Sequence, residues 1–172
     1  MGQIVVGLDF GGTATGGTAI DAESGAVLLE ESIEVPSLAD QGPARSMEQI
    51  HIAYQQAVVA ADSSPDDVIA IGLITPGPAK GDSTISRKGS SNLLHPGWAG
   101  FNSRNALMEL TGKPVSYTND GNAAALWGYR KKFGDSKDHV LEALIQGTGL
   151  GGGRVERGVL CTGFDGRAAE YG

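Results

Sequence analysis

Glycines gather at two places in this sequence where the backbone could approach a ligand closely. Of the 172 residues, 27 are glycine, about 16%, against a usual share near 7%. One cluster, GGTATGG, spans residues 11–17, and the other, GTGLGGG, spans residues 147–153. Glycine has no Cβ, so the N–H groups around it can point at an anion at close range. With the hydroxyls of Thr13 and Thr148, the clusters predict two phosphate-binding loops.

Neither loop matches a standard nucleotide-binding motif in full. The first comes within one residue of G-x-x-x-x-G-K-[ST], but Gly17 stands where that motif needs its phosphate-binding lysine. The second matches G-x-G-x-x-G, yet that fingerprint needs a helix directly after the turn, and GGGRVERG is a poor helix start. A single loop of this kind favours a plain hairpin turn. Two loops, each after an apolar strand and the first preceded by Asp9, favour phosphate binding.

Two aspartates are candidates for catalysis. Asp120 lies between an expected strand end and an expected helix start, where backbone N–H groups would keep a carboxylate ionised and directed into a cleft. Aspartate is also favoured as a helix N-cap, which is the structural alternative for Asp120. Asp9 ends the first apolar strand, and its alternative is an ordinary turn aspartate.

These residues must be positioned by alternating strands and helices. Apolar residues three and four apart between Met47 and Ala61 predict a helix, and β-branched runs predict strands. The expected strands cover residues 4–10, 18–21, 26–35, 68–74, 115–118 and 140–145, with two hairpin arms in 153–160 around a turn at 156–158, and the expected helices cover 43–62, 103–111 and 122–133. The 26 residues from 75 to 100 lack periodicity, which in a compact domain is typical of a functional loop.

Composition narrows the class of protein. The net charge of −7 repels nucleic-acid phosphates, so nucleic-acid binding is not expected. The single cysteine, Cys161, cannot form an internal disulfide, and no apolar run approaches the roughly 18 residues of a membrane helix. The N-terminus has no signal-type leader. We therefore expect a cytoplasmic protein that does not bind membranes.

Five segments together resemble the ROK sugar kinases. They occur in the order and approximate spacing of that family: LDFGGTATGGTAID from Leu8, ITPGP from Ile74, TNDGNAAALWGY from Thr118, GTGLGGG from Gly147 and AAEYG from Ala168. The resemblance covers essentially the whole chain. It implies an α/β fold of the actin-like ATPase (ribonuclease H-like) type that opens with an antiparallel ribbon. Residues 1–118 would be the N-terminal domain, and residues 119–172 would begin a second, incomplete domain.

The resemblance also implies an activity and assigns site residues. The activity is glucokinase-like, ATP-dependent phosphorylation of a hexose hydroxyl in the cleft between the two domains, with Mg²⁺ on the phosphates. Asp120 corresponds to the base that accepts the hydroxyl proton, and the sugar-binding positions are Gly77, Asn92, Asn119, Asp120 and Glu170. The nucleotide phosphates correspond to Asp9, Gly11, Gly12, Thr13, Gly147, Thr148 and Gly149, with Asp9 beside the magnesium ion.

The chain departs from the family pattern in three respects. Where relatives commonly have Lys or Arg after the first glycine pair, Ala14, Thr15 and Gly16 carry no charge. The histidine that follows the final glycine in relatives and their downstream cysteine cluster are absent. His51, His95 and His139 have no cysteine partners, so no zinc site is expected within this chain. The chain is expected to be a kinase fragment that is inactive alone and forms homo-oligomers.

Two other functions remain open at this point. A non-catalytic sugar sensor is the first, because the resembled family includes transcriptional repressors. Those carry an N-terminal helix-turn-helix, whereas the first strand here begins by about Ile4, which argues against a DNA-binding form. An actin-like structural ATPase is the second. The sequence does not choose among glucose, fructose, mannose and N-acylated sugars as the substrate.

Overall fold

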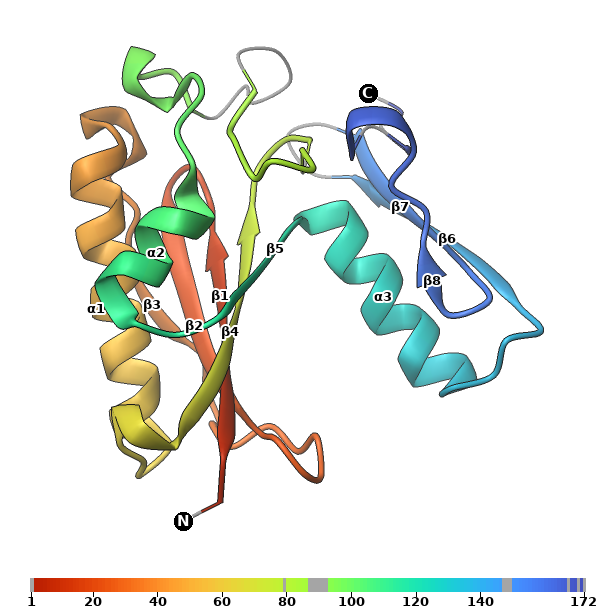
Figure 1. Ribbon diagram of the computed structural model, residues 1–172, viewed down its shortest axis with the longest axis horizontal. Coiled ribbons are helices and arrows are strands. Elements are labelled where there is room, and N and C mark those ends of the chain that lie inside the picture. The colour runs from red at the N-terminus through yellow and green to blue at the C-terminus, as the bar shows by residue number, and fades with distance from the viewer. Residues whose placement is uncertain are drawn as a thin grey trace.

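The computed structural model describes residues 2–78, 80–86, 93–146, 150–166, 168–169 and 171. They form a large lobe, residues 2–119, and a small lobe, residues 120–171, each built on its own sheet (Figure 1). The large lobe contains β1 Ile4–Phe10, β2 Ala14–Asp21, β3 Ile33–Pro36, α1 Pro43–Ala60, β4 Val68–Thr75, α2 Ser103–Thr111 and β5 Val115–Asn119. The small lobe contains α3 Asp120–Phe133, β6 Val140–Gln146, β7 Leu150–Glu156 and β8 Val159–Leu160.

The sheet of the large lobe has the strand order β3-β2-β1-β4-β5. Strands β1, β2 and β3 are antiparallel neighbours, which confirms the predicted opening ribbon, whereas β4 and β5 run parallel to β1. Both α1 and α2 cover the same face of the sheet (Figure 1). Side chains alternate across a strand, so Ile4, Leu8 and Phe10 are buried toward the helices and Asp9 points to the opposite face.

The second strand begins four residues earlier than predicted, at Ala14 instead of Thr18. The first glycine cluster is therefore a short turn at residues 11–13 followed by glycines inside a strand. A Cβ at Gly17 would lie 3.0 Å from the carbonyl oxygen of Ala53 in α1. Gly17 thus lets the helix pack against the strand.

The third predicted strand, residues 26–35, is also shorter in the structure. Only β3, Ile33–Pro36, pairs with β2, together with an isolated bridge between Ile20 and Val27. The chain between them leaves the sheet, and Leu28 and Val27 are exposed there. Leu29 still packs against the core of the large lobe, and the Leu28 N–H donates to the Ala19 carbonyl of β2 at 2.9 Å.

The small lobe packs α3 against one face of β6 and β7 (Figure 1). Its core consists of Ala125, Tyr129 and Val155, and it is separate from the core of the large lobe. The Tyr129 hydroxyl donates to the Ser136 carbonyl at 2.6 Å, which ties the end of α3 to the segment that leads into β6. The division of the chain into domains 1–118 and 119–172 stays a prediction. Within the described ranges, no helix combines the length and apolar character needed to cross a membrane.

Candidate functional site

The turn between β1 and β2 is the first of the predicted phosphate loops. Gly11 donates its N–H to the Ala14 carbonyl at 2.9 Å and closes the turn, and Thr13 is exposed. A Cβ at Gly11 would lie 2.9 Å from that same carbonyl oxygen, so only glycine closes the turn without displacement. Gly12 does not have a left-handed φ. What glycine offers a ligand at this position is therefore close approach and not an unusual backbone angle.

The Asp9 carboxylate of the large lobe lies within electrostatic range of the Asp120 carboxylate of the small lobe. Asp9 is the next-to-last residue of β1, where it pairs with Gly16 of β2 and Ile74 of β4. Partial burial raises the pKa of Asp9 above its ordinary value, and the Asp120 carboxylate raises it further. Both side chains reach solvent. Two carboxylates within this range repel each other, and a cation beside them would relieve the repulsion.

Helix α3 begins directly at Asp120. Asn119, not Asp120, is the N-cap, and its Oδ1 accepts the N–H of Asn122 at 2.9 Å. The structural alternative for Asp120 is therefore wrong, because that residue occupies the first helical position. Asp120 Oδ1 accepts the N–H of Gly121 at 2.8 Å, and the positive end of the helix dipole favours a negative charge there.

Glycines of β7 pack directly against the first turn of α3, which carries Asp120. A Cβ on Gly121 would overlap the carbonyl oxygen of Gly152, and a Cβ on Gly153 would overlap the carbonyl oxygen of Gly121. A Cβ at Gly151 would lie 4.0 Å from Asp120 Oδ1, which places the start of β7 beside this carboxylate. Residues Leu150–Glu156 form strand β7. This confirms that the second glycine cluster is not followed by the helix that a dinucleotide-binding fingerprint requires.

Gly77 follows β4 in a left-handed conformation with φ of 82°. Just before it, the buried hydroxyl of Thr75 donates to the hydroxyl of Tyr117 in β5 at 2.9 Å. Burial raises the pKa of the Tyr117 phenol, so it stays protonated at neutral pH. This bond joins the ends of two neighbouring strands at the point where the chain turns into the long loop.

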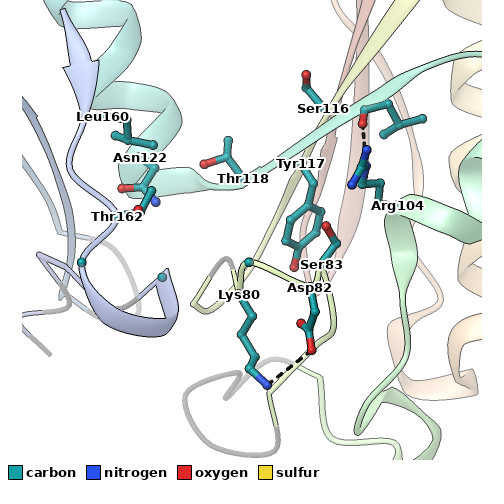
Figure 2. A pocket seen from close by; sticks show the side chains of 14 residues that line it. Lys80, Asp82, Ser83, Arg104, Ser116, Tyr117, Thr118, Asn122, Leu160 and Thr162 are labelled. Carbon is teal, nitrogen blue, oxygen red and sulfur yellow. Dashed lines mark hydrogen bonds and ion pairs between the residues drawn. The ribbon is translucent and has the colours of Figure 1, made fainter.

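A pocket of about 540 Å³ opens between the two lobes, and Figure 2 shows the side chains around it. Lys80, Asp82 and Ser83 line it from the large lobe, and Leu160 and Thr162 face them from the small lobe. Thr118 and Asn122 lie on either side of the Asn119–Asp120 pair and close the pocket. Gly77, Asn119 and Asp120 are not among its lining residues, so the structure places them beside this pocket and not in its wall.

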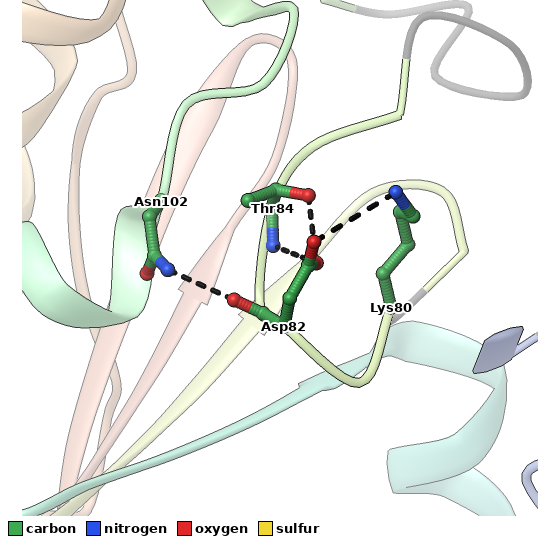
Figure 3. Close-up of polar contacts among 4 residues, drawn as sticks. All are labelled: Lys80, Asp82, Thr84 and Asn102. Carbon is green, nitrogen blue, oxygen red and sulfur yellow. Dashed lines mark hydrogen bonds and ion pairs between the residues drawn. The ribbon is translucent and has the colours of Figure 1, made fainter.

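The segment 80–86 holds its shape through Asp82 (Figure 3). The Asp82 carboxylate accepts the Thr84 hydroxyl at 2.7 Å and the Thr84 N–H at 3.0 Å, and these bonds lower its pKa. Asn102 donates to the Asp82 carbonyl at 2.9 Å, which connects the segment to the start of α2. The Lys80 ammonium lies 3.9 Å from the carboxylate. The pocket wall is therefore a hydrogen-bonded loop that carries one positive and one negative charge, on Lys80 and Asp82.

The remaining predicted positions lie outside the described residues. These are Asn92 and Glu170 of the sugar site and Gly147, Thr148 and Gly149 of the second phosphate loop. In the described parts of the chain, no three His, Cys, Asp or Glu side chains are grouped in a way that would hold a metal ion.

Sequence reasoning missed the pocket residues Lys80, Asp82 and Tyr117. The spacing of Asp82 and Thr84, an aspartate two residues before a threonine, is a local signal that could have identified the turn in segment 80–86.

Comparisons with known proteins agree with this architecture. The glucokinase of Halalkalibacterium halodurans is 33% identical over 167 residues, which are 97% of this chain and 48% of that protein. A ROK hexokinase structure from Thermus thermophilus superimposes with a TM-score of 0.79 at 33% identity and covers 98% of this chain and 52% of that one.

The ROK glucokinase of Streptomyces griseus, solved with glucose and AMPPNP, has a TM-score of 0.72 at 27% identity and covers 98% of this chain and 49% of that one. The chain thus spans about half the length of the relatives it matches. These neighbours confirm the expected actin-like ATPase fold. The model of the ROK family matches residues 5–172, and the chain belongs to this family.

Proposed function

We propose that the protein carrying this chain transfers the γ-phosphoryl group of ATP to a hydroxyl of a hexose. The single observation that carries the proposal is the meeting of Asp9 and Asp120 across the two lobes, beside a glycine turn and a polar pocket. Phosphoryl transfer needs a base, a phosphate cradle and a place for the acceptor. Each of these three parts has a candidate here.

Asp120 is the proposed base. It would accept the proton of the sugar hydroxyl as that oxygen attacks the γ-phosphorus. Its position at the first turn of α3 supports this role, because the helix dipole favours the carboxylate and the Gly121 N–H fixes its direction. Asn119 would contact a sugar hydroxyl, although its Oδ1 already caps the helix.

The turn at residues 11–13 is the proposed cradle for the phosphates, and Asp9 is the residue that would hold Mg²⁺ bound to ATP. Carboxylate oxygen is the ligand type that Mg²⁺ prefers, and the nearby Asp120 carboxylate adds negative charge at this place. When bound, the ion neutralises charge on the phosphates. The Thr13 hydroxyl and the N–H groups of the turn would bind phosphate oxygens directly.

The pocket between the lobes is the proposed acceptor site. Its volume of about 540 Å³ lies in the range of small-molecule sites, and hydroxyl and amide side chains line it. Ser83, Thr118 and Asn122 offer the mixed donors and acceptors that a sugar ring requires. Glucose is the first substrate to test, because the Streptomyces griseus relative was solved with glucose.

The test is a coupled ADP-release assay of the protein with Mg²⁺-ATP and a panel of hexoses and N-acylated hexosamines. We expect ADP release that depends on the sugar, with a different kcat/KM for each sugar. Sugar binding by calorimetry without ADP release for any sugar would contradict the kinase and favour a sensor. ATP hydrolysis that no sugar stimulates would favour a structural ATPase.

A further inference from the structure

The residue that follows β3 holds the β1–β2 turn from the side. Ser37 is completely buried, and its hydroxyl donates to the Gly12 carbonyl at 2.8 Å. Its backbone N–H donates to the Thr13 carbonyl at 3.0 Å. One residue therefore binds two successive carbonyl oxygens at the tip of the turn, where phosphate binding is proposed.

These two bonds determine where the N–H groups of the turn point. In a trans peptide the C=O and the next N–H point in opposite directions, and none of the described peptides is cis. With the Gly12 and Thr13 carbonyls directed at Ser37, the N–H groups of Thr13 and Ala14 point away from it. The Gly11 N–H is already used inside the turn. The orientation of the donors at the tip thus depends on Ser37.

Ser37 can serve this purpose because its own segment is fixed. Two residues later, the Ala39 carbonyl accepts the indole N–H of Trp98 at 2.8 Å. Trp98 is buried and packs against Phe10, the last residue of β1, with ring centroids 5.2 Å apart. The hydroxyl of Ser37 is therefore held on a rigid support that includes the end of the strand before the turn.

We propose that Ser37 is a positioning residue for the phosphoryl donor: it orients the N–H groups of the β1–β2 turn toward the triphosphate. The proposal rests on the proposed function of that turn. A preorganised cradle binds an anion without first ordering its donors, so the hydroxyl raises affinity for the nucleotide although it does not touch it. Neither Ser37 nor the β1–β2 turn lines the acceptor pocket, so the affinity for the sugar should not depend on the Ser37 hydroxyl.

The test is made in the protein that carries this chain and compares Ser37→Ala with the wild type and with Ser103→Ala. Ser103 is equally buried, lies at the start of α2, and its hydroxyl has no partner among the described residues. Mg²⁺-ATP is titrated while the backbone amides of residues 11–14 are followed by NMR, and glucose is titrated by calorimetry.

We expect Ser37→Ala to weaken Mg²⁺-ATP binding roughly threefold to tenfold, the effect of one lost hydrogen bond, with glucose affinity unchanged. The amide of residue 37, which donates to the Thr13 carbonyl, should also exchange faster with solvent in the variant without nucleotide. Ser103→Ala should match wild type in each measurement.

Three results would overturn the proposal, and they are distinguishable. Wild-type amides at 11–14 that ignore Mg²⁺-ATP would contradict the phosphate cradle and the role of Ser37 together. A normal wild-type response with equal affinity in Ser37→Ala would contradict the role of Ser37 alone. Equal weakening of Mg²⁺-ATP and glucose would show a general loss of structure and no positioning role.

Discussion

The contact between Gly121 and Gly152 allows a prediction whose sign and size follow from the structure. In Gly121→Ala, the added methyl would overlap the Gly152 carbonyl oxygen, which belongs to the backbone of β7 and cannot rotate away. The first turn of α3 must move off the strand. Overpacking of this kind costs roughly 1–3 kcal/mol, more than the gain of at most about 1 kcal/mol from replacing glycine in a helix.

Gly128 provides the matched control on the same helix. A Cβ there would lie 3.5 Å from the Leu141 side chain, an ordinary van der Waals contact. Gly128→Ala should therefore gain the helix propensity without the clash and stabilise the protein by up to about 1 kcal/mol.

Urea unfolding followed by circular dichroism measures both variants. We expect Gly121→Ala to unfold at lower urea and Gly128→Ala at higher urea than wild type. Because Asp120 precedes Gly121, the displaced helix should also lower kcat, on the order of 10²-fold for a shift of about 1 Å. A Gly121→Ala protein as stable as wild type would refute the backbone contact and the placement of Asp120 that depends on it.

Three further predictions address the separate parts of the site. Asp9→Asn should raise stability at pH 7 by less than about 1 kcal/mol, since partial solvent access screens the effect. Because the folded-state pKa of Asp9 is raised, protonated Asp9 stabilises the wild type fully below pH 3.8, and this contribution is lost as pH rises through the folded-state pKa. The melting temperature of Asp9→Asn should therefore exceed that of wild type at pH 7 and equal it in acid. Gly12→Val should raise the KM for ATP severalfold with little change in the KM for sugar, and an unchanged KM for ATP in folded protein would leave the turn without a ligand. Asp82→Ala should speed amide exchange at Thr84 and weaken hexose binding by calorimetry, whereas hexose affinity equal to wild type would remove the segment 80–86 from the acceptor site.

The sequence predicted those elements whose limits carry local signals. Helix α2 begins and ends at the predicted residues, because Asn102 caps it with a bond to the Asn105 N–H and Gly112 takes the left-handed conformation after it. The opening strand β1 also has its predicted limits, since its apolar alternation is complete.

Contacts between distant segments could not be predicted from the sequence. Gly17, Gly152 and Gly153 are glycines because another backbone packs against them, and a sequence does not show which segments meet in space. The same holds for Ser37, whose partners lie 25 residues away in the β1–β2 turn. The helix start at Asp120 was missed by two residues, because Asn119 and Asp120 are both good capping residues and only the structure shows that Asn119 caps.

The central claim is that Asp120 accepts the proton of the acceptor hydroxyl, and the most direct measurement is the steady-state kinetics of Asp120→Asn with Mg²⁺-ATP and hexose. Asparagine retains the size and can still accept the Gly121 N–H, but it cannot accept a proton. Asp138→Asn, an exposed aspartate in the turn before β6, is the matched control. We expect kcat to fall on the order of 10²-fold or more in Asp120→Asn, with hexose affinity by calorimetry nearly unchanged and Asp138→Asn like wild type. A kcat for Asp120→Asn within a few-fold of wild type would contradict the assignment of Asp120 as the base.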